Sequence, residues 1–484
     1  MVRAVTALIA LVLVVRLVWG WWVGRQLQAQ LDEIRQRGEP VAATDMVYPF
    51  VPDSENAWLL QLQAVQVIVK SGVESPSNSS LDCPNYLPYP AEWMKLAEAS
   101  EKVHGQAFAL ARQARQLSRV QFRQGLTSPT ISIILPYLNE AKQLANTIAD
   151  GAEYSHLKGD DGEAMERLMD LLHLARSLRQ DDFLVSQLVA IGIENIACNR
   201  MQMIGPGLRF DGTATTRPAT RAMVRPLIDR LLEDGLIADG IRRSFLIERV
   251  MWIDYCRTAS AGTWFIRPLA DRNIIRVNRN MAIMQEASKC NNWPDAKDVL
   301  KRCKWDPPVG AAIFWGPTPA PSRTVPRYSR LFHGWAGDLS AYLERQFRVL
   351  AERRVTAVSL ACQLYRADEG HWPHRLDELV PKYLPAAPKD PFYDDGRPLG
   401  YAVFKGGLPD GADRPMIFYN GEEKYLRPIA EPVYSWLSGG TQYRDVARFV
   451  PVKSTKAVDN NPQKSDAPRE QPQDQQKPTQ PEGK

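Results

Sequence analysis

The side chains best suited to metal chemistry lie around residue 370. His371 and His374 stand three residues apart, and Asp368, Glu369 and Asp377 lie beside them. Two ligands at positions i and i+3 need a helix, and the proline between the histidines disfavours a helical turn there. We therefore expect a partly exposed pair of histidines in a turn, without a bound metal or cofactor.

A second group of acidic residues, Glu153, Asp160, Asp161 and Glu163, surrounds the sequence GDDGEA. General acid–base catalysis needs a buried carboxyl pair, whereas acids at a turn between helices serve as solvated caps. The chain also has no nucleophile elbow, zinc-protease, dinucleotide-binding or P-loop motif. The sequence thus predicts no catalytic and no cofactor-binding residue.

The composition limits the class of protein. The 484 residues are 44% hydrophobic and 24% charged, as in packed globular proteins, and they suffice for two or three domains. The chain has 60 basic and 55 acidic residues, and its net charge of +5 gives no electrostatic case for nucleic-acid binding. We also expect Arg242, Arg243 and Arg249, which alternate with acids, to form a solvated helix face.

The N-terminus is the element that determines where the rest of the chain lies. A largely apolar run of about 20 residues begins at Ala4 and ends at Val23, which is the length of a helix that crosses a membrane. Arg16 interrupts the run, at a cost of about 2.5–3.5 kcal/mol at mid-bilayer. We expect its charge to reach back to the interface near Val23. The alternative is a pair with an acid on a partner's membrane helix.

A cleaved signal peptide is the competing interpretation, with residues 4–15 as its apolar core. The residues after the arginine are bulky and no A-x-A site follows closely, so we expect an uncleaved anchor. Arg3 favours a cytoplasmic N-terminus, whereas Arg25, Arg35 and Arg37 favour the opposite orientation. Because long domains translocate largely regardless of flanking charge, we expect a single-pass protein of the cytoplasmic (inner) membrane with its bulk outside the cytoplasm.

Hydrophobic periodicity predicts a mainly α fold. The expected parts are the anchor (1–23), a stalk and connector (24–90), a helical body (91–290), a proline-rich connector (291–334), a long helix with a small α/β module (335–430) and a disordered tail (431–484). Within the body, Gly159 should end one helix and Asp160 or Asp161 should cap the next. This pair resembles a tetratricopeptide-type hairpin. No second copy follows at a fixed period, so we expect an irregular helical bundle.

The six cysteines form no C-x-x-C motif, which excludes a zinc ribbon. Cys290 and Cys303 flank a loop-like stretch and could pair in an oxidising compartment. Cys198, Cys256 and Cys362 have the surroundings of ordinary buried thiols on helices. The sequence leaves the Cys290–Cys303 pairing open.

The C-terminal module follows directly from the long helix. Gly370 should end that helix, residues 375–380 should form a short helix, and residues 399–404 and 416–419 should pair as strands. A lone hairpin is unstable, so the strands must cover the helix. The ordered pattern consists of Tyr365, Gly370, Trp372-Pro373, Leu376, Leu379, Leu384, Pro388, Asp390-Pro391, Gly396, Pro398 and Tyr401.

This pattern resembles the globular part of the major pseudopilins of type II secretion. It is also similar to a set of uncharacterised membrane-anchored bacterial proteins, in which an anchor and a helical body precede the same module. The resemblance implies a fold for the end of the chain and an envelope setting. The chain lacks the pseudopilin processing site, and its body is far too large, so we do not expect a filament subunit.

The pseudopilin resemblance also implies calcium binding in the loops of the module. The oxygen ligands available for it are Asp390, Asp394 and Asp395, together with Asp410 and Asp413. Aspartates in turns also serve the turn itself, which is the role we expect for them.

Three functions are compatible with the sequence. The one we expect is a non-catalytic, membrane-anchored envelope protein that serves protein interaction or assembly with envelope protein partners. The second is a hydrolase-like enzyme whose site is assembled from scattered residues. The third is a module that binds an extended envelope polymer through Trp305, Trp315 and Trp335.

Overall fold

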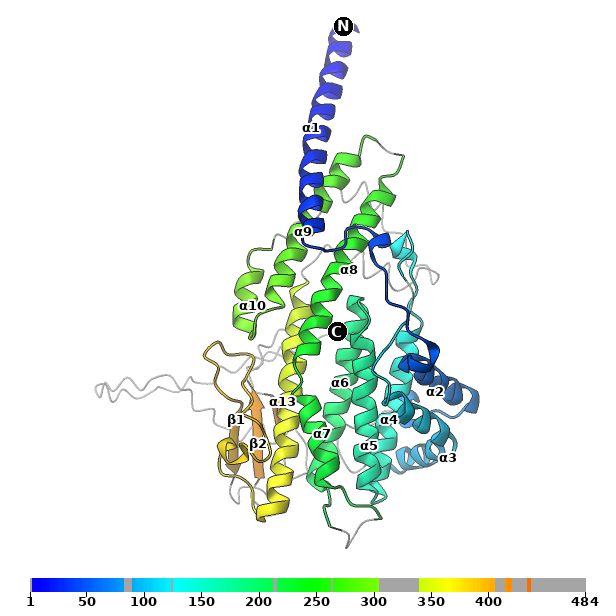
Figure 1. Ribbon diagram of the computed structural model, residues 1–484, viewed down its shortest axis with the longest axis vertical. Helices are drawn as coiled ribbons and strands as arrows, with labels where there is room; N and C mark the ends of the chain where they lie inside the picture. Colours follow the sequence, from blue (N-terminus) through cyan, green and yellow to red (C-terminus); the bar gives the residue numbers. More distant parts are fainter. Residues whose placement is uncertain are drawn as a thin grey trace, which may run out of the picture. The chain divides into compact units, whose positions relative to one another are not determined.

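The computed structural model describes residues 2–81, 89–122, 125–211, 216–262, 264–303, 339–404, 414–419 and 433–436, and this part of the chain is mainly helical, as predicted (Figure 1). The α-helices are α1 (Val2–Gln36), α2 (Ala57–Ser71), α3 (Ala91–Ala114), α4 (Tyr137–Leu157), α5 (Asp161–Arg179), α6 (Leu184–Ile204), α7 (Arg221–Leu231), α8 (Gly235–Ala259), α9 (Arg267–Ala287), α10 (Trp293–Leu300) and α13 (Ser340–Glu369). The strands are β1 (Gly400–Phe404), β2 (Arg414–Tyr419) and β3 (Val433–Trp436). Short 3₁₀ turns are η1 (Ala43–Asp45), η2 (Asp53–Glu55), η3 (Pro76–Asn78), η4 (Thr130–Ser132), η5 (Gly205–Gly207) and η6 (Leu376–Leu379).

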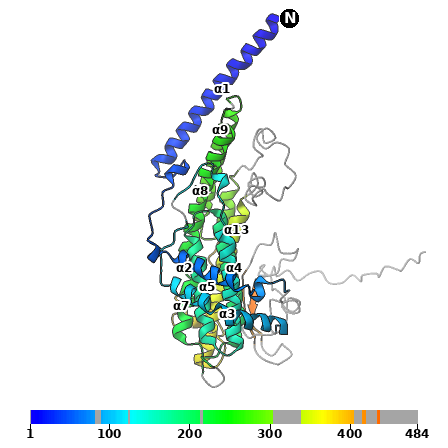
Figure 2. The ribbon, with the colours of Figure 1, turned by 90° about the vertical axis from the view of Figure 1, so that its right-hand side faces the viewer.

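Helix α1 combines two different surfaces in one unbroken helix. Its first part is apolar and exposed, and within the described residues it is the helix that is long and apolar enough to cross a membrane. Its second part buries Val23, Leu27, Leu31 and Ile34, a stripe with helical spacing, and packs on α9. The segment expected to be a stalk is therefore helical as far as Gln36 and packed against the body. Figure 2 shows the N-terminal part of α1 continuing past the tip of the α8–α9 hairpin.

The α4–α5 hairpin forms as the sequence predicts. Gly159 adopts a left-handed φ of 87°, which ends α4, and the Asp160 side chain accepts a hydrogen bond from the Glu163 amide, which caps α5. Helix α6 packs along α5, and α13 packs along α6 and α7. The apolar stripes of these helices meet in one large hydrophobic core.

A buried ion triad joins three of these helices. Glu194 on α6 accepts hydrogen bonds from Arg179 Nη2 of α5 at 2.7 Å and from Arg353 Nη1 of α13 at 3.0 Å. All three side chains are at least 94% buried. Arg353 also donates to the carbonyls of Arg230 and Leu231 at the end of α7, so one guanidinium satisfies groups from several helices.

Helices α8 and α9 form a second hairpin beside α1 (Figure 1). Helix α10 follows within the segment predicted to be a connector. Asn292 caps it by accepting from the Asp295 amide at 2.8 Å, and a proline occupies the first turn. Trp305 and Trp315 of the remaining connector lie outside the described residues, as does Trp335 at the start of the segment predicted to be the long helix.

The small module at the C-terminal end has the predicted strands. Gly370, with a φ of 78°, ends α13, and β1 pairs antiparallel with β2. Strand β3 pairs with the other edge of β2, giving the order β1-β2-β3, although residues 433–436 fall in the segment predicted to be disordered. The sheet packs on α13 through β2, where Ile417 and Tyr419 are buried.

Candidate functional site

Of the acids around the α4–α5 turn, Glu153 and Asp161 are buried, and Glu163 is half-buried and paired with arginines. The expectation of a solvated cap therefore holds for Asp160 alone. Asp161 is fully buried and lies 2.5 Å from His156 Nδ1 and 2.8 Å from Arg209 Nε. Burial raises the pKa of Asp161, but the hydrogen bonds from His156 and Arg209 outweigh burial and lower it to about 2. This carboxylate stays ionised at neutral pH and fixes the chain after α6 to the start of α5.

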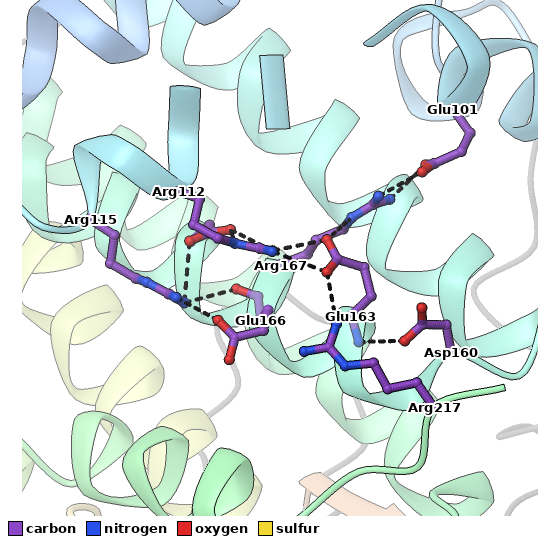
Figure 3. A network of polar contacts seen from close by, with 9 residues as sticks. Glu101, Arg112, Arg115, Asp160, Glu163, Glu166, Arg167 and Arg217 are labelled. Carbon is purple, nitrogen blue, oxygen red and sulfur yellow. Dashed lines mark hydrogen bonds and ion pairs between the residues drawn. The ribbon is translucent and has the colours of Figure 1, made fainter. Parts of the chain in front are cut away.

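A charge network ties α3 to α5 (Figure 3). Glu163 accepts from Arg112 Nη2 at 2.9 Å and from Arg167 Nε at 3.0 Å, and Arg217 lies 3.4 Å away. Arg167 also forms a bidentate pair with Glu101 at 2.6 Å. Burial acts to raise the pKa of Glu163, but the arginines lower it below its usual range. The network is thus a set of matched charges that holds two helices together.

Asp170 is the most buried acid of the same network. Its side chain is 1% exposed and lies 3.2 Å from both Arg112 and Arg115, and Arg115 also contacts Glu166. Burial raises the pKa of Asp170 to about 6 against the opposing effect of the two arginines. Each acid in Figure 3 has a cationic or main-chain partner, so none of them is positioned as a free general base.

Helix α4 carries a buried carboxyl pair, Asp150 and Glu153. Asp150 accepts from the Ser77 amide at 2.7 Å, and Arg200 of α6 bridges Asp150 at 3.2 Å and Glu153 at 2.9 Å. Tyr89 donates to Glu153 at 2.5 Å. Burial raises the pKa of Glu153 to about 6, and Arg200 opposes that rise. These partners enclose both carboxylates, which indicates a structural cluster between α4, α6 and the η3 turn.

The histidine pair lies where the sequence places it, in an exposed turn after α13. The rings of His371 and His374 stack with centroids 5.7 Å apart. The acids nearby have other partners: Asp368 binds Arg221 and Asp377 binds Arg375. Among the described residues, no group of three His, Cys, Asp or Glu side chains is arranged to hold a metal ion.

The calcium candidates have the surroundings of turn residues. Asp390 is buried and accepts from the Phe392 amide at 2.9 Å, while the exposed Asp395 accepts from the Arg397 amide at 3.0 Å. Asp394 is also exposed. Asp410 and Asp413 lie outside the described residues.

The five cysteines that the structure describes carry free thiols. Cys198, Cys256 and Cys362 are buried on α6, α8 and α13, as predicted. Cys290 and Cys303 are half-buried on either side of α10 and are not joined by a disulfide. Burial raises the pKa of the Cys290 thiol, which lowers its reactivity as a thiolate.

The helix face around residue 245 is also less solvated than predicted. Arg249 is 1% exposed and donates to Glu39 Oε2 at 2.6 Å, and Arg243 pairs with Asp182 at 2.9 Å. The prediction failed because Glu39 comes from the segment after α1, whose return to α8 is a tertiary contact.

Arg16 has an environment that the sequence did not predict. Its guanidinium binds the main chain of the turn between α8 and α9. Its Nε donates to the Phe265 carbonyl at 2.9 Å, its Nη2 donates to the Trp264 carbonyl, and both aromatic rings lie beneath the guanidinium at 5.4–5.6 Å. Gly20 leaves room for this guanidinium, since a Cβ there would lie 2.6 Å from Arg16 Nη1 and 3.2 Å from Pro268 Cγ.

Two grooves flank the part of α1 that follows the apolar run. One, of about 550 Å³, lies between α1 and α9 and is lined by Gln30, Ile34, Asn278, Arg279 and Arg302 among others. The second, of about 340 Å³, is lined by Arg35, Glu39, Asp45, Asp182 and Arg243 among others. The candidate functional site is therefore this end of the body, where α1 meets the α8–α9 hairpin.

Comparison with family models, with curated proteins and with solved structures finds no match to this chain.

Proposed function

We propose that the chain is a single-pass anchored protein of the cytoplasmic membrane, with its body outside the cytoplasm, that serves protein interaction or assembly and not catalysis. The observation that carries the proposal is the continuity of α1, which is exposed and apolar in its first part and packed on α9 in its second. The body is thereby held against the anchor without a loose tether.

The two grooves beside α1 support recognition over catalysis. Their acids are engaged by neighbouring groups: Glu33 by Arg37 at 2.8 Å, Glu286 by Arg302 at 2.5 Å and Asp182 by Arg243. Paired charges on a half-open surface suit a polar contact with another protein, in which orientation and specificity come from charge complementarity. A hydrolase site would instead need an accessible acid or base without such a partner.

The finer fold assignments belong to the same proposal. The α4–α5 pair, with its Gly159 and Asp160 ends, supports a tetratricopeptide-like hairpin. A long helix followed by an antiparallel sheet supports the pseudopilin-like interpretation of the module. An envelope location remains our prediction and rests on these resemblances.

Membrane topology is tested with a C-terminal tag on the full chain. We expect the tag to stay in the membrane fraction after carbonate extraction, to resist protease in intact cells and to be cut after the outer barrier is opened. Protection until the inner membrane is lysed would place the body in the cytoplasm and refute the proposed topology. Release by carbonate would refute the anchor itself.

Interaction is tested by photo-crosslinking in cells, with a photoreactive phenylalanine replacing Arg279, which lines the larger groove and is exposed. The matched control replaces Val69, which is 61% exposed on α2, away from α1. We expect discrete protein adducts from position 279 and none from position 69. Equal adducts at the two positions, or none at 279, would refute the groove as an interaction surface.

A further inference from the structure

The turn between α8 and α9 exposes aromatic side chains at the end of the body nearest the N-terminal part of α1. Trp264 is 58% exposed and Phe265 is 56% exposed, and their rings contact each other edge to face at 5.7 Å. We call residues 259–262 and 264–267 the aromatic tip. Arg257, just before it, and Arg267, at its end, are also exposed.

The contact with Arg16 fixes the level of the aromatic tip along α1. Arg16 lies within the apolar run, and the exposed side chains on either side of it are Val15 and Leu17, with Trp21 and Trp22 one to two turns further on. Because α1 is straight and rises about 1.5 Å per residue, Arg16 lies about 10 Å from Val23, the last residue of the run. The aromatic tip therefore lies alongside the apolar run, about 10 Å inside its end at Val23.

The contact also removes two costs that a membrane would impose. An arginine in hydrocarbon needs acceptors for its guanidinium, and the main chain of a turn at that depth needs donors for its carbonyls. The Arg16 guanidinium donates to the carbonyls of Trp264 and Phe265, so each group satisfies the other. The aromatic side chains themselves remain exposed and apolar, with an indole N–H suited to the headgroup level.

We propose that the aromatic tip is a second membrane-contact site, in which Trp264 and Phe265 enter the boundary between headgroups and acyl chains of the leaflet on the body's side. The flanking Arg257 and Arg267 then face lipid phosphates, as basic residues at a membrane surface do. The inserted depth of about 10 Å lies at the upper end of the 5–10 Å typical of interfacial segments. This inference rests on the proposed function, because it requires α1 to cross the membrane.

Lipid explains the exposed aromatic side chains of the tip better than a protein partner does, because the tip is bound to α1 within the apolar run. A bilayer that surrounds the apolar run of α1 necessarily surrounds what is bound at Arg16, and the tip is bound there through its main chain. The body would then be held at two separate points, the α1 span and the aromatic tip. Such an arrangement fixes the rotation of the body about α1 and keeps the grooves beside α1 close to the lipid surface.

The test measures lipid depth in the full-length protein, reconstituted in nanodiscs of phosphatidylcholine and phosphatidylglycerol. Cys83, Cys290 and Cys303 are replaced by serine, since the other three cysteines are buried. A single cysteine is then introduced and labelled with an environment-sensitive fluorophore, and quenching by nitroxide-bearing lipids is recorded. The labelled variants are Ala261→Cys in the aromatic tip, Leu17→Cys on the lipid face of α1 and Val69→Cys on the body, all at exposed positions.

We expect lipid quenching at position 261 to be comparable to that at 17 and several-fold above that at 69. If lipids quench the label at position 17 but quench position 261 as weakly as position 69, the aromatic-tip proposal is overturned and the anchor is kept. Trp264 and Phe265 would then be free to contact a protein partner. Absence of quenching at 17 would overturn the anchor, and with it this inference. The two failures are therefore distinguishable in one experiment.

Discussion

The substitution Glu248→Gln should make the protein more stable, and the gain should grow with pH. Glu248 lies on α8, is fully buried, and its carboxyl oxygens lack a hydrogen-bonding partner among the described residues. Burial raises its pKa to about 8, and no side-chain hydrogen bond or charge in the part of the chain that the structure describes offsets that rise. Glutamine has the shape of the protonated acid and cannot ionise, so the variant removes only the cost of keeping this carboxyl neutral.

The pH dependence follows from the ordinary glutamate pKa of 4.5 in the unfolded chain. Below that pH the carboxyl is protonated in both states. Above it the unfolded chain ionises first, so the free energy of unfolding of the wild type falls until about pH 8 and then levels off. One pKa unit corresponds to about 1.4 kcal/mol, so Glu248→Gln should gain less than about 1 kcal/mol at pH 5 and about 3 kcal/mol at pH 7.

Urea unfolding of the detergent-solubilised full chain, followed by circular dichroism at 222 nm, measures this difference at pH 5, 7 and 8. The matched control is Glu74→Gln, at an exposed position before η3. Other buried acids, such as Glu153 and Asp170, titrate alike in wild type and variant, so their contributions cancel. A gain that is the same at all three pH values, or a loss at pH 8, would show that Glu248 is ionised in the folded protein and would refute the reasoning.

Three further substitutions test other contacts by the same unfolding measurement. Glu194→Ala should lower the free energy of unfolding by about 3–5 kcal/mol, because it leaves two buried guanidinium groups without their carboxylate. The control Glu98→Ala, which removes an exposed ion pair, should show no resolvable change. A small effect at position 194 would mean that the triad is open to water. The ionised Asp161 stabilises the wild type fully above the pKa of this carboxyl in the unfolded chain, near 3.8, and the stabilisation is lost as the pH falls through about 2. Asp161→Asn should remove it, so the free energies of unfolding of the two proteins should differ at neutral pH and converge in strong acid. Parallel pH profiles would contradict the lowered pKa of Asp161. Gly159→Ala should lower the free energy of unfolding by about 1–2 kcal/mol, because residue 159 has a left-handed backbone. Gly192→Ala, on α6 with open space around it, should raise it by up to about 1 kcal/mol. Equal effects of the two substitutions would contradict the assigned backbone.

The parts of the fold that the sequence predicts are those set by local chemistry. Gly159, Asp160 and Gly370 end or cap helices because of their own backbone preferences and hydrogen-bonding groups, so their positions can be read without knowing the tertiary structure. The start of α10 also carried a signal, an asparagine followed by Trp293-Pro294, but it was hidden among the prolines of the connector.

The burial of charged residues could not be predicted in this way, because it depends on partners distant in sequence. Arg249 is buried since the chain after α1 brings Glu39 to it, and Glu153 is buried since Tyr89 and Arg200 close over it. The environment of Arg16 was the hardest to foresee, because its acceptors are main-chain carbonyls that any residue type could supply. The visible signal was a pair of adjacent aromatics in a short turn between two polar helix ends.

The contact between Arg16 and the Phe265 carbonyl joins residues 249 positions apart, and this separation imposes an order on biosynthesis. At about 5–20 residues per second, Arg16 leaves the ribosome roughly 12–50 s before its acceptors do. In the anchored protein that we propose, a nascent helix with an uncompensated arginine must enter the bilayer, or stay bound by the insertion machinery, during that interval. The Arg16 contact can form only once the α8–α9 hairpin is complete, so under this proposal the protein reaches its final position in the membrane late in its own translation.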